Sequence, residues 1–268
     1  YSRHIITGLK RTEDGIFRNG VRAWTSQAVH AGDVIETHLV ETEPSDGILP
    51  RPVPFSVVYE DDDILVVDKP ADTPIHPSIG NYENTLANGI AWYFEQKGEP
   101  FVYRCINRLD RDTTGLIVLA KHALSAAVLS QAMRSREIHR TYQAFALGET
   151  AASGTIDAPI ARLNGSLIQR TVDFASGERS VTHYRTLAHC SVFSHLELNL
   201  ETGRTHQIRV HMAYIGHPLL GDTLYNKTPG TFPRQALHSA SLSFVHPITG
   251  EPLTFHAPLP EDMQNLLT

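Results

Sequence analysis

The sequence predicts an α+β fold built around a mixed, mostly antiparallel central sheet flanked by helices, and three features carry that prediction. Continuous apolar runs at residues 64–67 and 116–120 are typical of buried strands. The later half of the chain is rich in strand-like segments joined by short connections. Short connections indicate antiparallel pairing, because parallel strands need long crossovers.

Residues 1–50 are predicted to form a small N-terminal unit that ends in a linker. We expect a short helix over 2–10 and a tight hairpin turn at Asn19-Gly20. A short strand is predicted over 34–39. The segment 41–54 contains four prolines and is interpreted as a linker, because proline cannot continue a central strand.

The second unit, residues 51–268, is predicted to hold the main sheet. Between 123 and 133, apolar residues recur at helical spacing, at Leu124, Ala127, Val128 and Ala132. Residues 142–147 are interpreted as a strand. Alternating apolar side chains predict a half-buried strand near 192–200, with Val192, Leu196, Leu198 and Leu200 on one face together with Ser194. The segment 236–257 is predicted to be a hairpin.

Composition excludes few functions. The chain is 41% hydrophobic and 19% charged, an ordinary globular balance. No segment approaches the roughly 20 apolar residues needed to cross a bilayer, and no signal-peptide pattern is present. Two isolated cysteines favour a reducing, cytoplasmic setting. The fifteen histidines are scattered without the spacing of a zinc site, so we expect no metal.

The net charge is −6, so any nucleic-acid site must be a local basic patch. Net charge alone slightly favours an enzyme that acts on a small molecule.

The polar segment 107–115, directly before the second apolar run, is the first candidate for chemistry. Loops held by a rigid sheet often carry catalytic groups. Asp110 and Asp112 are flanked by Arg108 and Arg111, and a nearby arginine favours the ionised form of a carboxylate. An ionised carboxylate can act as a nucleophile or a base. The alternative is a solvated turn held by surface ion pairs.

The second candidate is the segment 201–211, which is predicted to enter a helix capped by Thr205. Its apolar face consists of Ile208, Met212 and Ile215, and it ends at Gly216 and Pro218. Donors for RNA phosphate or for a partner carboxylate gather near its N-terminus, at Arg204, His206, Gln207 and Arg209. An ordinary surface helix is the alternative.

The third candidate is Tyr142, which lies on a predicted strand. Its ring could stack on a base, a contact worth about 1–3 kcal/mol. Core packing is the alternative, because aromatic residues are common on strands.

Taken together and in order, these segments resemble the RluA family of pseudouridine synthases over residues 55–260. The longest matching stretches are 108–116, 142–144 and 203–211, with shorter ones at 68–70, 75–78, 217–222 and 237–239. The resemblance implies an RNA uridine isomerase that needs no cofactor and no metal. It also implies structured ribosomal or transfer RNA as the substrate, a monomer without an obligate protein partner, and a target nucleotide flipped out of its helix.

By the same resemblance, Asp110 is the essential carboxylate and Arg209 is its partner. Tyr142 packs against the target base, and Arg108 takes the place of that base in the RNA. The other residues expected to contact RNA are Arg111, Arg204, His206 and Gln207.

One departure from the family pattern is Asn107, where many members have histidine; asparagine also donates and accepts hydrogen bonds. The segments 15–20 and 32–35 resemble, more faintly, part of the small RNA-binding module that often precedes this catalytic domain. A simple packing appendage is the alternative for that unit.

Two rival functions are considered for the whole chain. The first is a catalytically silent RNA-binding relative, which would have little need of Asp110, Tyr142 and Arg209 together. The second is a glycoside hydrolase with Asp110 and Asp112 as its acids, but two neighbours in a short loop do not establish the opposed geometry that such an enzyme needs.

Overall fold

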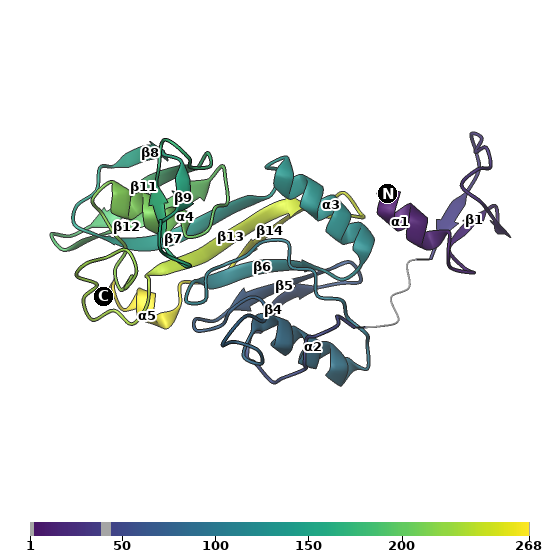
Figure 1. The fold of residues 1–268 in the computed structure, drawn as a ribbon, viewed down its shortest axis with the longest axis horizontal. Helices are drawn as coiled ribbons and strands as arrows, with labels where there is room; N and C mark the ends of the chain where they lie inside the picture. The colour runs from purple at the N-terminus through teal and green to yellow at the C-terminus, as the bar shows by residue number, and fades with distance from the viewer. Residues whose placement is uncertain (1–2, 39–43, 268) are drawn as a thin grey trace.

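The computed structural model describes residues 3–38 and 44–267, and its main element is one nine-stranded sheet (Figure 1). The strand order is β4-β5-β6-β13-β7-β12-β11-β8, and β14 also pairs with β13. All pairings in this sheet are antiparallel except the short parallel contact between β6 and β13. The predicted α+β class with a mixed, mostly antiparallel sheet is therefore confirmed.

The strands of the main sheet are β4 (Ser56–Glu60), β5 (Ile64–Lys69), β6 (Thr114–Ala120), β7 (His139–Leu147), β8 (Ser153–Asp157), β11 (Val181–His189), β12 (Phe193–Leu200), β13 (Leu237–Val245) and β14 (Pro252–His256). A separate hairpin consists of β9 (Ile160–Arg162) and β10 (Arg170–Val172). The helices of this body are α2 (Leu86–Lys97), α3 (Ala123–Arg134), α4 (Gln207–Tyr214) and α5 (Glu261–Gln264). None of the helices in the described ranges is long and apolar enough to span a bilayer.

β5 and β6 are buried on both faces, which explains their continuous apolar runs. On β5, Leu65 and Val67 pack into one core with α2 and α4, while Ile64 and Val66 pack into another that includes Leu129 of α3. Alternate residues of a strand point to opposite faces, so a strand covered on both sides must be apolar at every position. The predicted strands at 142–147 and 192–200 and the hairpin at 236–257 are also present, but Val192 is exposed and precedes β12.

The helix predicted over 123–133 is confirmed as α3, but the apolar residues whose spacing predicts it are not its most buried ones. The fully buried residues of α3 are Ser125 and Leu129, whereas Val128 is exposed. Most residues of α3 itself are small or apolar, so more than one face of the helix could be buried. The contact with the sheet decides which face is buried.

The N-terminal unit consists of α1 (Arg3–Leu9) and a three-stranded sheet of order β2-β1-β3, with β1 (Ile16–Arg18), β2 (Val21–Arg22) and β3 (Ile35–Thr37). The predicted hairpin turn is confirmed, because Asn19 and Gly20 both have positive φ between the paired ends of β1 and β2. Ser2, Leu39 and residues 41–43, which the sequence assigns to the helix, the strand and the linker, lie outside the described residues.

The described part of the predicted linker, residues 44–54, is irregular but attached to the main body. Leu49 O accepts a hydrogen bond from the Asn88 side chain at 2.7 Å, and Arg51 N donates to Asn88 O at 3.1 Å. Asn88 lies in the first turn of α2 and also completes a capping box with Thr85. This stretch is therefore anchored on α2 through its backbone.

The parallel contact between β6 and β13 depends on Gly115. Its φ is +110°, and a Cβ there would lie 2.3 Å from Ser239 O. Only glycine permits both this backbone conformation and this close approach. The contact brings the start of β6, and the polar loop before it, beside β13, which pairs with β7 along its other edge.

We predict that Gly115→Ala lowers the free energy of unfolding by about 2–4 kcal/mol, because it combines backbone strain with overpacking against β13. Gly250→Ala is the matched control: Gly250 also has positive φ, but nothing lies within 4 Å of its added Cβ. Strain alone should cost the control about 1 kcal/mol. Urea denaturation measures both, and equal losses would contradict the role given to the close approach.

Candidate active site

The polar loop before β6 and the first turns of α4 meet in a chain of charges. Arg209 Nη1 donates to Asp110 Oδ2 at 3.0 Å. On its other side, the Arg209 guanidinium binds Asp222 through two hydrogen bonds of 2.7 and 2.9 Å. One arginine therefore links a carboxylate of the loop to a carboxylate that follows α4.

The exposure of the side chains decreases from Asp110 through Arg209 to Asp222. The side chains of Asp110, Arg209 and Asp222 are 25%, 8% and 0% exposed. A buried charge must be paired, and Asp222 supplies the buried partner that fixes Arg209. Burial acts to lower the pKa of Arg209, but the hydrogen bonds to Asp222 and Asp110 and the charges of both carboxylates raise it. Only Asp110 presents its carboxylate to solvent. The Asp110 carboxylate is therefore oriented by a fixed arginine and remains accessible to a ligand.

His206 and Tyr225 form the second wall around Asp110. His206 Nε2 lies 3.9 Å from Asp110 Oδ1, and its Nδ1 is 2.8 Å from the Tyr225 hydroxyl. Burial lowers the pKa of His206, an effect that the nearby Asp110 charge only partly opposes. The lowered pKa favours the neutral imidazole, and Arg209 is the cation that forms a hydrogen bond with Asp110.

The sequence places the N-cap of α4 at Thr205, and this prediction is wrong. The N-cap is His206, in the left-handed conformation with φ of 59°, and it makes no side-chain capping bond. A non-glycine residue pays about 1–2 kcal/mol for this conformation. Strained residues persist where the surroundings hold them, often at functional sites. Here the strain turns the imidazole toward Asp110 and Tyr225.

The backbone of the polar loop is held by buried donors. Lys69 Nζ donates to Arg111 O at 2.8 Å, and Arg234 Nη1 donates to Asp112 O at 3.1 Å. Lys69 is fully buried, and this burial lowers its pKa to about 7 although Asp112 and Asp110 act to raise it. These contacts hold the loop from beneath.

Asn107 closes the same loop onto β6. Its side chain is buried, with Oδ1 accepting from Val118 N at 2.9 Å and Nδ2 donating to Leu116 O at 3.1 Å. The side-chain amide of Asn107 thus forms one donor and one acceptor hydrogen bond with the backbone of β6, like the backbone of a neighbouring strand. Asn107 therefore supports the backbone of the loop and of β6.

A groove of about 760 Å³ opens above Asp110. Its lining includes Tyr142, Asp110, Glu201 and six arginines, namely Arg108, Arg111, Arg134, Arg136, Arg140 and Arg204. A narrow extension of about 60 Å³ is lined by Asp110, Tyr142, His206 and Arg209 together. Arginines outnumber carboxylates three to one in the groove, although the whole chain carries a net charge of −6. The local basic patch required by the sequence therefore exists.

The structure brings most predicted site residues to this groove but not all in the expected manner. Arg108 and Arg204 are exposed and line it, and Tyr142 is buried in its wall. Arg111 is exposed at its edge and pairs with Asp72.

The resemblance implies that Gln207 contacts RNA, but in the structure its side chain is buried. It accepts hydrogen bonds from Thr202 and from the backbone N–H of Arg204, and donates to Val181 O and Thr182. We therefore assign Gln207 to holding the 202–206 turn.

Sequence reasoning missed the roles of Asp222 and Tyr225. Asp222 belongs to the matching stretch 217–222, but nothing in the sequence pairs it with Arg209. The Tyr225 ring packs 5.1 Å from the Arg209 guanidinium and its hydroxyl bonds to His206. A tyrosine in an irregular segment gives no signal of such a role.

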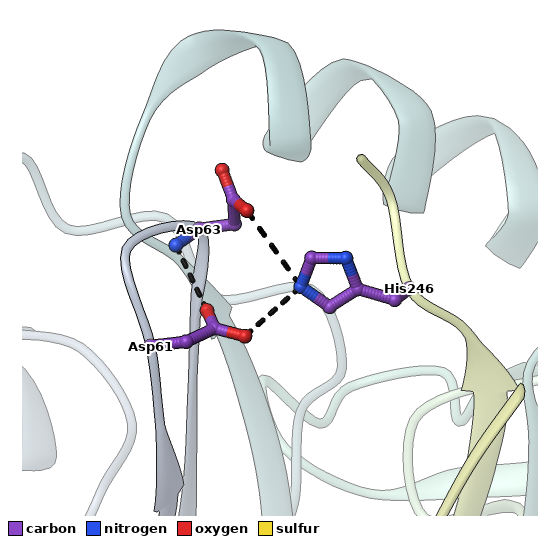
Figure 2. A group of neighbouring side chains, drawn as sticks. All are labelled: Asp61, Asp63 and His246. Carbon is purple, nitrogen blue, oxygen red and sulfur yellow. Dashed lines mark hydrogen bonds and ion pairs between the residues drawn. The ribbon is translucent and has the colours of Figure 1, made fainter. Parts of the chain in front are cut away.

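One group of potential metal ligands occurs in the described ranges, Asp61, Asp63 and His246 (Figure 2). His246 Nδ1 accepts the backbone N–H of Thr249 at 3.0 Å, so the ring proton is on Nε2, which donates to Asp61 Oδ2 at 3.0 Å. A metal ligand must offer a free lone pair, and this imidazole has both nitrogens engaged. The group instead ties the turn between β4 and β5 to the end of β13.

Comparisons with known proteins agree on one family. A family described as "RNA pseudouridylate synthase" matches residues 63–214. The chain is 40% identical to an uncharacterized RNA pseudouridine synthase of Bacillus subtilis, over 99% of this chain and 94% of that protein. It is 43% identical to ribosomal large subunit pseudouridine synthase D of Vibrio cholerae, over 88% and 76%. A human protein, RNA Pseudouridylate Synthase Domain Containing 1, has a similar structure with a TM-score of 0.65 and 26% identity, over 81% and 86%.

We predict that Asp222→Asn lowers the free energy of unfolding by about 3–5 kcal/mol, because it removes the charge that compensates buried Arg209. Asp72→Asn removes a carboxylate from the exposed pair with Arg111 and should cost less than about 1 kcal/mol. Urea denaturation of both variants at low salt tests this. Similar costs for the two would refute the supporting role of Asp222.

Proposed function

The chain belongs to the RluA family and is an RNA pseudouridine synthase, and we propose that it isomerises specific uridines of large-subunit ribosomal RNA with Asp110 as its essential carboxylate. The Asp110–Arg209 pair, which lines the narrow extension of an arginine-lined groove, carries this proposal. The named activity of the Vibrio cholerae relative supports ribosomal RNA as the substrate.

Isomerisation of uridine requires one oriented carboxylate and a site that keeps the detached uracil in place. The bond from ribose C1′ to uracil N1 breaks, the base turns, and a bond from C1′ to C5 forms. The C5 proton leaves and N1 gains a proton, so composition and oxidation state are unchanged. No redox cofactor is needed for such a balance.

Asp110 is suited to two roles in this reaction. It can attack C1′ and form a covalent intermediate, as carboxylates do in retaining glycosidases, or it can remove a ribose proton and give a glycal-like intermediate. In both roles Arg209 keeps the carboxylate ionised and oriented. Tyr142 lines the same narrow extension and is proposed to pack against the uracil.

The groove favours a polyanion over a small neutral substrate. Its arginines come from the loop before β6, the end of α3, the start of β7 and the turn before α4. Arg140 Nε is buried and has no hydrogen-bond partner among the described residues, although a cationic donor normally has one. An RNA backbone along the groove supplies such acceptors.

Base flipping follows from the position of Asp110 inside the groove and its narrow extension. A stacked and paired uridine cannot enter this space or turn its base, so the nucleotide must leave the helix at a cost of a few kcal/mol. Arg108 is exposed at the rim of this groove. We assign it to the space that the flipped base leaves.

The remaining assignments are part of the same proposal. Residues 51–268 form the catalytic domain, and residues 1–50 comprise a partial RNA-binding module with its linker. The enzyme acts as a monomer in the cytoplasm. The two unpaired cysteines support the cytoplasmic setting, because disulfides are rare in reducing compartments. A glycoside hydrolase is disfavoured because Asp110 is paired with Arg209, whereas Asp112 lines none of the cavities around Asp110.

We predict that Asp110→Asn abolishes tritium release from large-subunit ribosomal RNA labelled at uridine C5, because the amide neither attacks C1′ nor removes a proton. RNA binding should persist, since the arginines are unchanged. Asp112→Asn, two residues along the same loop, is the control and should keep activity within about tenfold. Near-normal turnover by Asp110→Asn would reject Asp110 as the catalyst.

We expect chelation to leave activity unchanged, because the proposed chemistry uses only protein groups. The enzyme is treated with EDTA, dialysed free of it, and then mixed with RNA folded separately in magnesium, so that the RNA structure is not disturbed. Initial rates of tritium release are compared with those of untreated enzyme. Loss of activity that zinc restores would overturn the metal-free mechanism.

A further inference from the structure

The β9–β10 hairpin holds two arginines face to face. Arg162 and Arg170 are direct cross-strand partners in this antiparallel pair. Like charges placed directly opposite each other destabilise a hairpin. This pair therefore lowers the stability of the free protein, so we looked for a ligand that would favour two arginines at this place.

Both arginines line a cavity of about 570 Å³ that Arg108 and Arg204 also line. We propose that these four arginines form a binding site for a backbone phosphate of the RNA, on the strand that flanks the target uridine. This inference rests on the proposed function and extends it to a second contact region, because Arg108 and Arg204 also line the groove above Asp110.

The charges in this cavity are poorly compensated. Its one acidic residue is Glu178, whose carboxylate pairs with Arg204 at 2.5 Å and is itself 68% exposed. Among the described residues, the Arg170 guanidinium forms hydrogen bonds only with the carbonyls of Ile168 and Gln169, at 3.5 and 3.4 Å. Arg162 is exposed and forms no ion pair with any carboxylate in the described ranges. Two guanidinium groups therefore remain available to an external anion.

Hydrogen bonds connect the β9–β10 hairpin to Tyr225 and, through it, to His206 beside Asp110. Arg170 N donates to the Tyr225 hydroxyl at 2.9 Å, and the same hydroxyl bonds to His206 Nδ1. Gln169 Nε2 also donates to Leu224 O at 3.2 Å. A phosphate held here is therefore at a fixed place relative to Asp110, so binding it aligns the strand as well as attracting it.

Arginine chemistry favours a phosphate over a protein carboxylate. Planar guanidinium groups bind phosphate oxygens through paired, charge-assisted hydrogen bonds. Four of them around one cavity exceed what one carboxylate can neutralise, whereas consecutive phosphates of an RNA strand supply several charges. The cavity and the groove share Arg108 and Arg204, so the phosphate in the cavity would belong to the same RNA strand as the target uridine.

The test compares two double variants that each remove two positive charges. Arg162→Ala with Arg170→Ala removes the hairpin pair; Arg51→Ala with Arg185→Ala is the control, since both residues are partly exposed in ion pairs and line none of the cavities described above. Binding of transcribed large-subunit ribosomal RNA is measured against salt concentration in the Asp110→Asn background, so turnover plays no part. KM, kcat and thermal midpoint are measured with Asp110 intact.

The hairpin variant should bind RNA about tenfold more weakly, and the slope of log K against log salt should fall by about 1–2 relative to the control. KM should rise while kcat stays within about threefold, and the thermal midpoint should hold or increase because the like-charge pair is gone. Arg162→Lys with Arg170→Lys should retain most of the salt slope. Equal affinity and slope for the hairpin and control variants would overturn the proposal.

The result separates this inference from the proposed function. If wild-type protein released no tritium from this RNA, the assignment of the substrate would fail, yet the binding comparison would still decide the role of the arginines. If the wild type were active and the hairpin variant lost kcat and thermal stability together, the pair would be structural and the phosphate site would be rejected.

Discussion

The buried ion pair between Arg209 and Asp222 is the interaction on which the site depends. Asp222 has no exposed surface, and a carboxylate in that environment persists only if a cation and further hydrogen bonds satisfy it. Arg209 supplies two bonds, and the backbone N–H groups of Leu224 and Tyr225 supply two more. With one edge of the guanidinium fixed in this way, the remaining edge points at Asp110, which is 99 positions earlier in the chain. Folding of the core therefore also orients the Asp110 carboxylate, which we propose to be the essential one.

The sheet makes that meeting possible by its connectivity. Asp110 precedes β6, Tyr142 lies on β7, and Arg209 lies on α4, and β13 is inserted between β6 and β7. Gly115 permits the close parallel contact that joins the two halves of the sheet. The polar loop is then fixed from below by Lys69 and Arg234 and closed onto β6 by Asn107. Loop residues thereby acquire the rigidity of the sheet, as preorganised catalysis requires.

The distribution of charge reconciles an acidic chain with a polyanionic substrate. Carboxylates are spread through the chain, whereas arginines from several separate segments converge on the groove and on the neighbouring cavity. Long-range repulsion from a net charge of −6 is screened over about 8–10 Å at physiological salt, so the local arginines dominate at contact. The opposed pair on the β9–β10 hairpin fits the same design, because a repulsive arrangement in the free protein becomes favourable beside phosphate.

The sequence alone determined the local chemistry. Continuous apolar runs specified β5 and β6, the Asn19-Gly20 dipeptide specified a hairpin turn, and the ordered motifs around Asp110, Tyr142 and Arg209 indicated the family and hence the activity. The tertiary structure decided what depends on distant partners. The buried face of α3 is chosen by the sheet, the N-cap of α4 is shifted to His206 by contacts with Tyr225, and Gln207 is turned inward by Val181 and Thr182. Asp222 and the Arg162–Arg170 pair became visible only in three dimensions, because local patterns encode which face is apolar but not which residues from separate segments will meet.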